Sequence, residues 1–331
     1  MDRHMNVRAA RCLEYGSPAN LVVESVDLPD PGPGEVLVEV HAAAVNFPDI
    51  LIVANEYQVR APLPFTPGSE LAGVVAAVGD DVADLAPGDR VFGQVFVGAF
   101  AEAVVMPVAS VERIPAGIDV ESAAAFGVAY TTAYHALRSI AEVRSGDWVL
   151  VLGAAGGVGL AAVELAAALG GRVIAAASSR VKLEHCRAKG AAEVVDYECE
   201  DLKVRVKAIT GGGADVVIDP VGGAMTDPAL RATRWGGRYV VVGFASGEIP
   251  RIPANLILLK GCIVRGFTLQ GLMEHAADDR ARDRAELFEL WHSGAVRPHV
   301  SKVFGLDQVG KAMAVIADRT AIGKVLIDPR G

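Results

Sequence analysis

The chain has 331 residues, of which 52% are apolar and 36 are glycine, enough for two domains with sizeable cores. Its formal net charge of −9 argues against a nucleic acid or an anionic membrane as the main partner. No apolar run reaches the ~20 residues that a membrane-spanning helix needs. The start, residues 1–6, is polar and has no apolar signal core behind it, so we expect a cytoplasmic location.

The cysteines are few and widely scattered along the chain. They are Cys12, Cys186, Cys199 and Cys262. So few thiols in a long chain argue against a disulfide framework, and we expect free thiols in a reducing compartment.

Short strand-like runs separated by glycine and proline fill the first third of the chain. The run 36–40, Val-Leu-Val-Glu-Val, has valine at every second position and so follows a period of two, after the turn-rich segment 29–34. Further runs lie at 73–78, 90–92, 100–105 and 111–114. This spacing predicts an all-β, barrel-like unit.

Strands and helices then alternate. Asp119 can cap a helix that runs through 123–125 towards Ile140. We expect strands at 148–152, 172–176, 194–196, 215–219, 238–242 and 263–267, and helices at 157–169 and 179–189. Strands buried on both faces between crossover helices form a parallel, doubly wound sheet. A mixed pattern follows, with helices at 281–293 and 308–318 and strands at 300–304 and 324–327.

A strand, a glycine-rich turn and the start of a helix meet at 148–159. Unpaired backbone N–H groups at such a helix end can hold a pyrophosphate, and glycine lets the backbone approach the anion closely. The pattern G-x-G-x-x-G is incomplete, because Ala154 takes the place of its first glycine. The residues expected to bind are Ala155, Gly156, Gly157, Val158 and Gly159.

The segment 67–75, Pro-Gly-Ser-Glu-Leu-Ala-Gly-Val-Val, resembles the Gly-His-Glu-x-x-Gly signature of the medium-chain zinc alcohol dehydrogenases. Ser69 stands where those enzymes have a zinc-binding His, and Asn46 where they have a Cys. A hydroxyl and an amide do not replace imidazole and thiolate as zinc ligands. The Cys-x-x-Cys cluster of the family's structural zinc is also missing. The chain therefore resembles the zinc-independent quinone oxidoreductase (zeta-crystallin-like) branch, and we expect no metal.

The resemblance covers nearly the whole chain and implies an α/β protein of two domains. A GroES-like, β-rich catalytic domain is expected at 1–126 and 267–331, and a Rossmann nucleotide-binding domain at 127–266. The resemblance adds cofactor contacts at Thr132, Tyr197, Gly243, Phe244, Ala245, Phe267 and Leu269. These added residues can instead serve core packing.

The end of the second strand of the alternating region distinguishes NAD from NADP. NAD enzymes usually have an acid there, which binds the ribose 2′-hydroxyl. Here the run has no acid and contains Ser178, Ser179, Arg180 and Lys182. Hydroxyls and cations bind a 2′-phosphate, so we expect NADPH. The alternative is that Arg180 and Lys182 are only solvated residues in the first turn of a helix.

Without a metal, the substrate must be oriented by shape and hydrogen bonds while the nicotinamide delivers hydride. In the resembling family, an Asn-Phe-x-Asp segment and a downstream Tyr line the reaction cleft. They correspond to Asn46, Asp49 and Tyr57. Asn46 and Tyr57 can hydrogen-bond a substrate carbonyl oxygen, and Tyr57 can supply a proton. Alternatively, Asn46 caps a turn, Asp49 starts a helix and Tyr57 stacks on loop prolines.

These features predict an NADPH-dependent reductase of conjugated carbonyl compounds, with quinones as the leading substrate class and enones as related substrates. One alternative is reduction of an enoyl thioester or another α,β-unsaturated acyl compound. An alternative of another class is a non-catalytic, cofactor-binding structural role, as in lens crystallins. The resemblance also implies a homodimer that pairs along the edge strand at 262–267.

Overall fold

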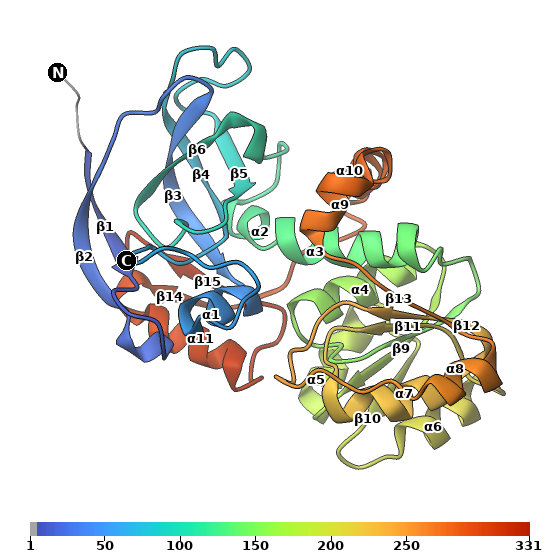
Figure 1. Cartoon of the computed structure of the whole chain (residues 1–331). Coiled ribbons are helices and arrows are strands. Elements are labelled where there is room, and N and C mark those ends of the chain that lie inside the picture. The colour runs from blue at the N-terminus through green and yellow to red at the C-terminus, as the bar shows by residue number, and fades with distance from the viewer. Residues whose placement is uncertain (1–4) are drawn as a thin grey trace. The chain divides into compact units, whose positions relative to one another are not determined.

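A computed structural model describes residues 5–331, which form two compact units (Figure 1). The first unit runs to Val128 and resumes at Pro298, and the second comprises Ala129–Arg297. The residues 1–4 of the polar start lie outside the described residues. We describe the two units one at a time.

The first unit is built mainly of strands. They are β1 (Met5–Arg11), β2 (Val22–Leu28), β3 (Glu35–Val45), β4 (Glu70–Val78), β5 (Arg90–Gln94), β6 (Ala103–Pro107), β7 (Val111–Arg113), β14 (Val300–Gly305) and β15 (Lys324–Asp328). Its helices are α1 (Phe47–Ala54), α2 (Val120–Ala124) and α11 (Val309–Ala317). The main sheet has the order β14-β15-β3-β4-β5-β7, β6 pairs with β3, and β1 pairs with β2. This β-rich unit agrees with the predicted GroES-like domain.

The pairing of β3 with β4 forms the centre of this unit. Val36, Val38 and Val40 point inward with no exposed surface, as the period-two pattern predicted. A Cβ atom on Gly73 of β4 would lie 1.8 Å from the carbonyl oxygen of Glu39. Only glycine therefore lets the two strands approach this closely.

The second unit alternates strands and helices. Its strands are β8 (Trp148–Val151), β9 (Arg172–Ala177), β10 (Glu193–Asp196), β11 (Ala214–Asp219), β12 (Thr233–Val241) and β13 (Ile263–Gly266). Its helices are α3 (Gly127–His135, starting in the first unit), α4 (Gly157–Ala168), α5 (Arg180–Ala188), α6 (Leu202–Thr210), α7 (Thr226–Ala232), α8 (Ala254–Lys260), α9 (Leu269–His275) and α10 (Ala277–His292).

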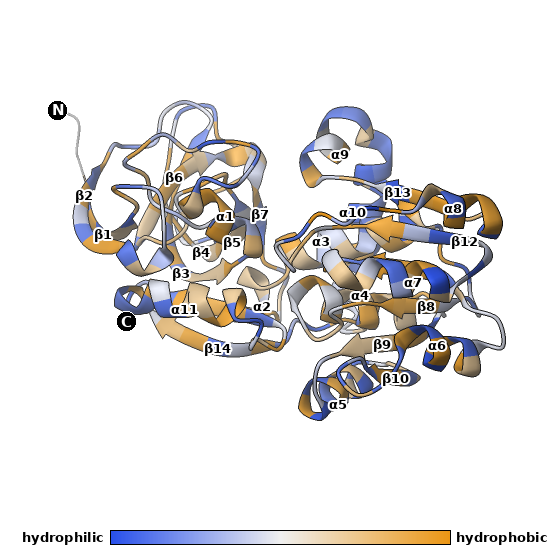
Figure 2. Cartoon of the chain, turned by 60° about the horizontal axis from the view of Figure 1, so that its bottom comes forward, coloured by the Kyte–Doolittle hydropathy of each residue, from blue (hydrophilic) through white to orange (hydrophobic). Residues whose placement is uncertain are grey.

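The six strands of the second unit are parallel, in the order β10-β9-β8-β11-β12-β13. Helices cover both faces of this sheet, with α4 on one face and α7 on the other (Figure 1). Strands β8 and β9 carry apolar colours in Figure 2, and Val149 to Val151 have no exposed surface. The strand order and burial confirm the predicted doubly wound Rossmann sheet.

The predicted helix from Asp119 to Ile140 is interrupted. Asp119 caps α2 as expected, through a 2.7 Å bond from the backbone N–H of Ser122. After α2, the backbone N–H of Val128 donates to Oε1 of Glu70 instead of continuing the helix (2.7 Å). The chain then forms α3 and a π-helical turn at Ala136–Ile140. A long-range contact to β4 thus overrides the local helical pattern.

The chain leaves the second unit later than the sequence indicated. We expected the return at 267, whereas the compact second unit continues to Arg297. Its helix α10 is bonded to α3, because Asp283 lies 2.7 Å from His135 Nδ1 and Glu286 accepts the Tyr134 hydroxyl at 2.7 Å. None of the helices in residues 5–331 has the length and apolarity needed to cross a lipid bilayer.

Candidate functional site

A buried polar cluster in the first unit joins three elements. Asn46 follows β3, Glu70 begins β4 and Lys324 begins β15, and the register of the three strands brings them together. Lys324 Nζ donates to Asn46 Oδ1 (2.6 Å) and to Glu70 Oε2 (3.0 Å), and Asn46 Nδ2 donates to Glu70 Oε2 (3.1 Å). These three residues are 4% (Lys324), 0% (Glu70) and 8% (Asn46) exposed. Such a buried ion pair is tolerated because hydrogen bonds compensate its lost hydration.

The Asn46 amide is therefore largely engaged within the protein. Its second N–H hydrogen is directed at the Ala44 carbonyl over a longer distance of 3.4 Å. This weaker bond is the one that a substrate oxygen can replace. Asn46 is also the N-cap residue of α1, the structural role that we considered as an alternative.

Asp49 is a buried carboxyl group beside this cluster. It is the third residue of α1, is 1% exposed, and its Oδ2 accepts the backbone N–H of Asn46 at 2.7 Å. Its Oδ1 is buried and has no hydrogen-bond partner of normal geometry among the described residues. Burial raises the pKa of Asp49 to about 7, against the effects of the Asn46 N–H, the Ser69 hydroxyl and the Lys324 charge. Near neutral pH this carboxyl can therefore hold or release a proton.

Tyr57 lies in the loop after α1 and is half-buried against the apolar core of the first unit. Burial raises the pKa of its hydroxyl, and the negative charge of Asp49 raises it further. The hydroxyl thus stays protonated at neutral pH and interacts electrostatically with Asp49. Asn46, Asp49 and Tyr57, predicted from the sequence, together offer hydrogen-bond donors and an exchangeable proton.

Glu70 and Lys324 were not among the residues predicted for the site. Glu70 lies within the motif at 67–75, but nothing in that motif indicates its partner. Lys324 is 254 positions further along the chain. A cation directly before the apolar run 325–327 is the only local signal, because a lysine that starts a buried strand needs a partner.

The glycine-rich loop of the second unit has the geometry of an anion cradle. Gly156 is the N-cap of the 12-residue helix α4 and has no side chain with which to cap it, so the first N–H groups of the helix can bind an anion. A Cβ atom on Gly159 would lie 2.2 Å from the carbonyl oxygen of Gly153, so the tight turn requires glycine there. The predicted loop residues 155–159 meet at this turn, which fits a dinucleotide pyrophosphate.

The predicted phosphate-binding residues gather at the end of β9. Ser179 caps α5 through the backbone N–H of Lys182 (3.4 Å), and Lys182 Nζ donates to Ser178 Oγ (3.1 Å). The guanidinium of Arg180 is 90% exposed and is paired with Glu184 at 2.9 Å. The Tyr197 backbone N–H donates to the carbonyl of Ala177 (3.3 Å), which places this residue beside the same strand end.

The other predicted cofactor residues lie in or next to helices and strands of the second unit. Gly243, Phe244 and Ala245 follow β12, at the same carboxyl edge of the sheet as the glycine loop. Thr132 lies within α3 and Leu269 begins α9. The Phe267 ring makes an edge contact with the buried His135 of α3, at 5.1 Å between ring centroids. Phe267 therefore has at least a packing role.

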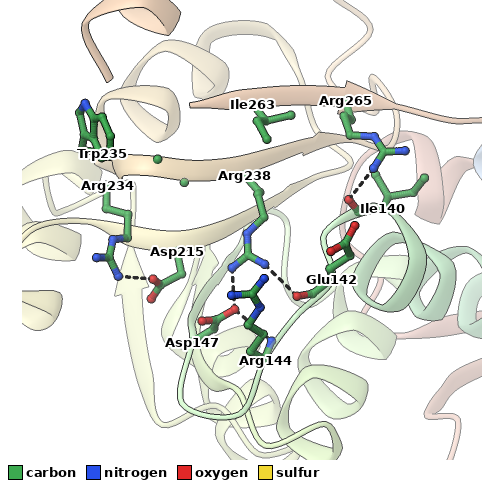
Figure 3. Close-up of a pocket in the computed structure, with 12 residues that line it drawn as sticks. Ile140, Glu142, Arg144, Asp147, Asp215, Arg234, Trp235, Arg238, Ile263 and Arg265 are labelled. Carbon is green, nitrogen blue, oxygen red and sulfur yellow. Dashed lines mark hydrogen bonds and ion pairs between the residues drawn. The ribbon is translucent and has the colours of Figure 1, made fainter. Parts of the chain in front are cut away.

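A cavity of about 540 Å³ in the second unit lies away from these residues (Figure 3). It is formed at the amino ends of the strands, whereas open α/β sheets bind ligands at the carboxyl ends. Three of its four arginines are engaged: Arg234 pairs with Asp215, Arg238 with Asp147 (2.6 Å), and Arg265 donates to the Ile140 carbonyl (3.3 Å). We therefore do not assign the cofactor to this cavity.

The described residues contain no group of three or more His, Cys, Asp or Glu side chains that could hold a metal ion. At the two positions where zinc-dependent relatives carry ligands, Asn46 is bonded to Lys324, and Ser69 acts on the Asp49 carboxyl.

Comparisons with known proteins agree with this architecture. The family model described as "Alcohol dehydrogenase GroES-like domain" matches residues 32–116, and "Zinc-binding dehydrogenase" matches residues 157–283. The chain is 39% identical over 327 residues to quinone oxidoreductase-like protein 2 homolog of Nematostella vectensis, which covers 98% of this chain and 89% of that protein.

Solved structures are similar over nearly the whole chain. A quinone oxidoreductase of Pseudomonas syringae pv. Tomato has a TM-score of 0.90 and 31% identity, covering 98% of this chain and 100% of that chain. The Escherichia coli quinone oxidoreductase complexed with NADPH has a TM-score of 0.89 and 30% identity, covering 98% and 99%.

A GroES-like unit joined to a Rossmann unit with a glycine-rich phosphate cradle defines a nucleotide-dependent oxidoreductase. The chain belongs to the medium-chain dehydrogenase/reductase family, in its quinone oxidoreductase-like group.

Proposed function

We propose that this protein is an NADPH-dependent reductase of quinones and related conjugated carbonyl compounds that works without a metal ion. One observation carries the proposal: at the position of the family's zinc site, the amide of Asn46 is bonded to the Lys324 ammonium, and beside them lies the Asp49 carboxyl, whose Oδ1 has no hydrogen-bond partner among the described residues. This set can donate hydrogen bonds and a proton, but it does not resemble a zinc ligand set.

NADPH fits the second unit, where the glycine loop and the Ser178 to Lys182 segment match a pyrophosphate and a 2′-phosphate. The bound cofactor supplies hydride to the conjugated system of the substrate. The residues of the first unit supply the rest of the chemistry. Tyr57 and the weakly bonded N–H of Asn46 orient the substrate carbonyl oxygen and stabilise the negative charge that it gains.

The reduced substrate then needs one proton. Asp49 carries a proton below pH about 7, and its Oδ1, which has no hydrogen-bond partner of normal geometry among residues 5–331, is the atom through which the proton can leave. We assign Asp49 as the proton reservoir and Tyr57 as the group that passes the proton to the substrate oxygen. Lys324 and Glu70 hold Asn46 in place and take no part in the proton transfer.

The experiment is to follow NADPH oxidation with a panel of quinones, enones and enoyl-coenzyme A thioesters, using the wild type, Tyr57→Phe and Asp49→Asn. Quinone or enone turnover that falls at least about tenfold in each variant supports the proposal. Turnover with enoyl thioesters alone would assign the protein to that substrate class. NADPH binding without turnover of any compound would leave a structural role instead.

We further propose that the protein is a homodimer. Strand β13 is at the edge of the sheet, and within the part of the chain that the structure describes it pairs only with β12. Large apolar side chains around it are exposed: Ile263 54%, Leu258 81%, Leu259 70% and Trp235 77%. Leu258 and Leu259 lie on α8, which is strongly apolar in Figure 2. An unpaired apolar edge is a surface that a second copy can cover.

Light scattering tests the dimer at micromolar concentration. The wild type is expected at twice the 34.5 kDa mass of the chain. Ile263→Asp, which places a charge on the edge strand, is expected to give monomers, while Val181→Asp on the exposed surface of α5 is the control. A monomeric wild type would contradict the proposal.

The four cysteines are free, three of them buried, which supports a reducing, cytoplasmic location.

A further inference from the structure

One buried carboxylate of the second unit has no role in the chemistry assigned above. Asp219 is the last residue of β11 and is 1% exposed. Its Oδ1 accepts the backbone N–H groups of Val221 (2.9 Å) and Gly222 (2.8 Å). Its Oδ2 accepts the hydroxyls of Thr226 (3.0 Å) and Tyr239 (2.6 Å). Four donors thus replace the water that an ionised carboxylate loses on burial.

The loop that Asp219 holds is joined to the segment after β12. The Ala245 N–H donates to the Pro220 carbonyl (3.0 Å), and the Ser246 N–H donates to the Val221 carbonyl (2.9 Å). The loop 220–222 and the segment 243–246 therefore form one hydrogen-bonded layer. Because the Asp219 carboxylate fixes the backbone of the loop 220–222, it also influences the conformation of the segment 243–246 that is bonded to this loop.

This layer contacts two parts of the cofactor site. A Cβ atom on Gly222 would lie 2.8 Å from Cδ1 of Phe244, so the loop backbone packs against the Phe244 ring. A Cβ atom on Gly153 would lie 2.7 Å from a methyl carbon of Val221, so Val221 packs against the turn that leads into the glycine loop. Displacement of the loop 220–222 would therefore move both the Phe244 ring and the turn at Gly153, because protein interiors are close-packed.

We propose that Asp219 is a positioning residue for NADPH, acting through Val221 and Gly222 to hold the glycine turn and the Phe244 segment in their binding conformation. Asp219 does not itself touch the cofactor. The proposal rests on NADPH binding by the second unit, and it does not depend on the substrate. Removal of the carboxylate takes away the acceptor of the Val221 and Gly222 N–H groups and of two hydroxyls, and the loop must rearrange to satisfy the two N–H groups.

The test is the equilibrium dissociation constant for NADPH, measured by fluorescence with the full-length chain in the absence of substrate. Asp219→Ala is expected to weaken binding at least about tenfold, and Asp219→Asn, whose carbonyl oxygen still accepts the two loop N–H groups, to restore it to within about threefold. Tyr239→Phe is the matched control, because it removes one buried bond to the same carboxylate and leaves the loop bonds intact. It should bind NADPH like the wild type.

Hydrogen exchange supplies a second readout. Amides of 153–159 and 243–246 should exchange faster in Asp219→Ala than in Tyr239→Phe at equal global stability. If Asp219→Ala does not fold, Gly222→Ala tests the same loop and is expected to weaken NADPH binding. Its Cβ would meet the Phe244 ring, and the φ of +68° at this position disfavours a residue other than glycine. Wild-type affinity in Gly222→Ala or Asp219→Ala, or equal losses in Tyr239→Phe, would overturn the proposal. A wild type that binds no NADPH would instead refute the proposed function.

Discussion

Replacement of Lys324 by Met tests the buried cluster of the first unit. The substitution leaves the Glu70 carboxylate buried, with the Lys324 ammonium gone from 3.0 Å away. At that distance an effective dielectric constant of about 20 gives a Coulomb attraction of roughly 5 kcal/mol. Breaking a buried ion pair by removing one partner costs about 3–5 kcal/mol, because the remaining charge is left uncompensated. We expect a loss of this size in the free energy of unfolding.

Urea denaturation and thermal unfolding measure the loss. The double variant Lys324→Met, Glu70→Gln removes both charges and is expected to recover at least half of it, since a neutral pair needs less solvation. Lys311→Met is the control, because this lysine of α11 is exposed. A cost below about 1 kcal/mol for Lys324→Met, the range of exposed ion pairs, would show that this pair does not stabilise the fold as a buried ion pair.

Two further predictions concern proton supply and cofactor choice. Because burial raises the pKa of Asp49 to about 7, kcat should fall as the pH rises through 7, and Asp49→Asn should lower the rate and remove this limb. A raised folded-state pKa also means that the stability contributed by Asp49 is present at low pH and is lost as the pH rises from about 4 to 7. The denaturation midpoint of the wild type should therefore fall over this pH range relative to that of Asp49→Asn. Midpoints with the same pH dependence in both proteins would argue against a raised pKa of Asp49. The wild type should prefer NADPH to NADH at least about tenfold in kcat/KM, and Arg180→Ala or Lys182→Ala should weaken NADPH use alone. Equal losses with both cofactors would show that these cations do not read the 2′-phosphate.

Local patterns in the sequence were sufficient to predict the Rossmann sheet and its phosphate loop. The inner strands β8, β9 and β11 are short, mostly apolar runs that are largely buried, and the strand, the glycine turn and the helix start all lie within the twelve residues 148–159. The capping of α2 by Asp119 was also predictable, because a cap is a contact between residues three apart.

Contacts between distant residues account for what the sequence did not reveal. The helix expected to Ile140 is broken because Glu70 accepts the Val128 N–H, across 58 positions. Lys324 reaches Asn46 only through the register of β15 with β3, which no local pattern specifies. The late return of the chain at Pro298 depends likewise on the bonds of α10 to α3.

NADPH oxidation by the purified wild type, in excess quinone and with a strong chelator present, tests the central claim most directly. We expect full turnover, no stoichiometric zinc by elemental analysis, and at least about tenfold slower reaction with NADH. Tightly held zinc whose removal abolishes turnover, or no reduction of any quinone or enone, would contradict it.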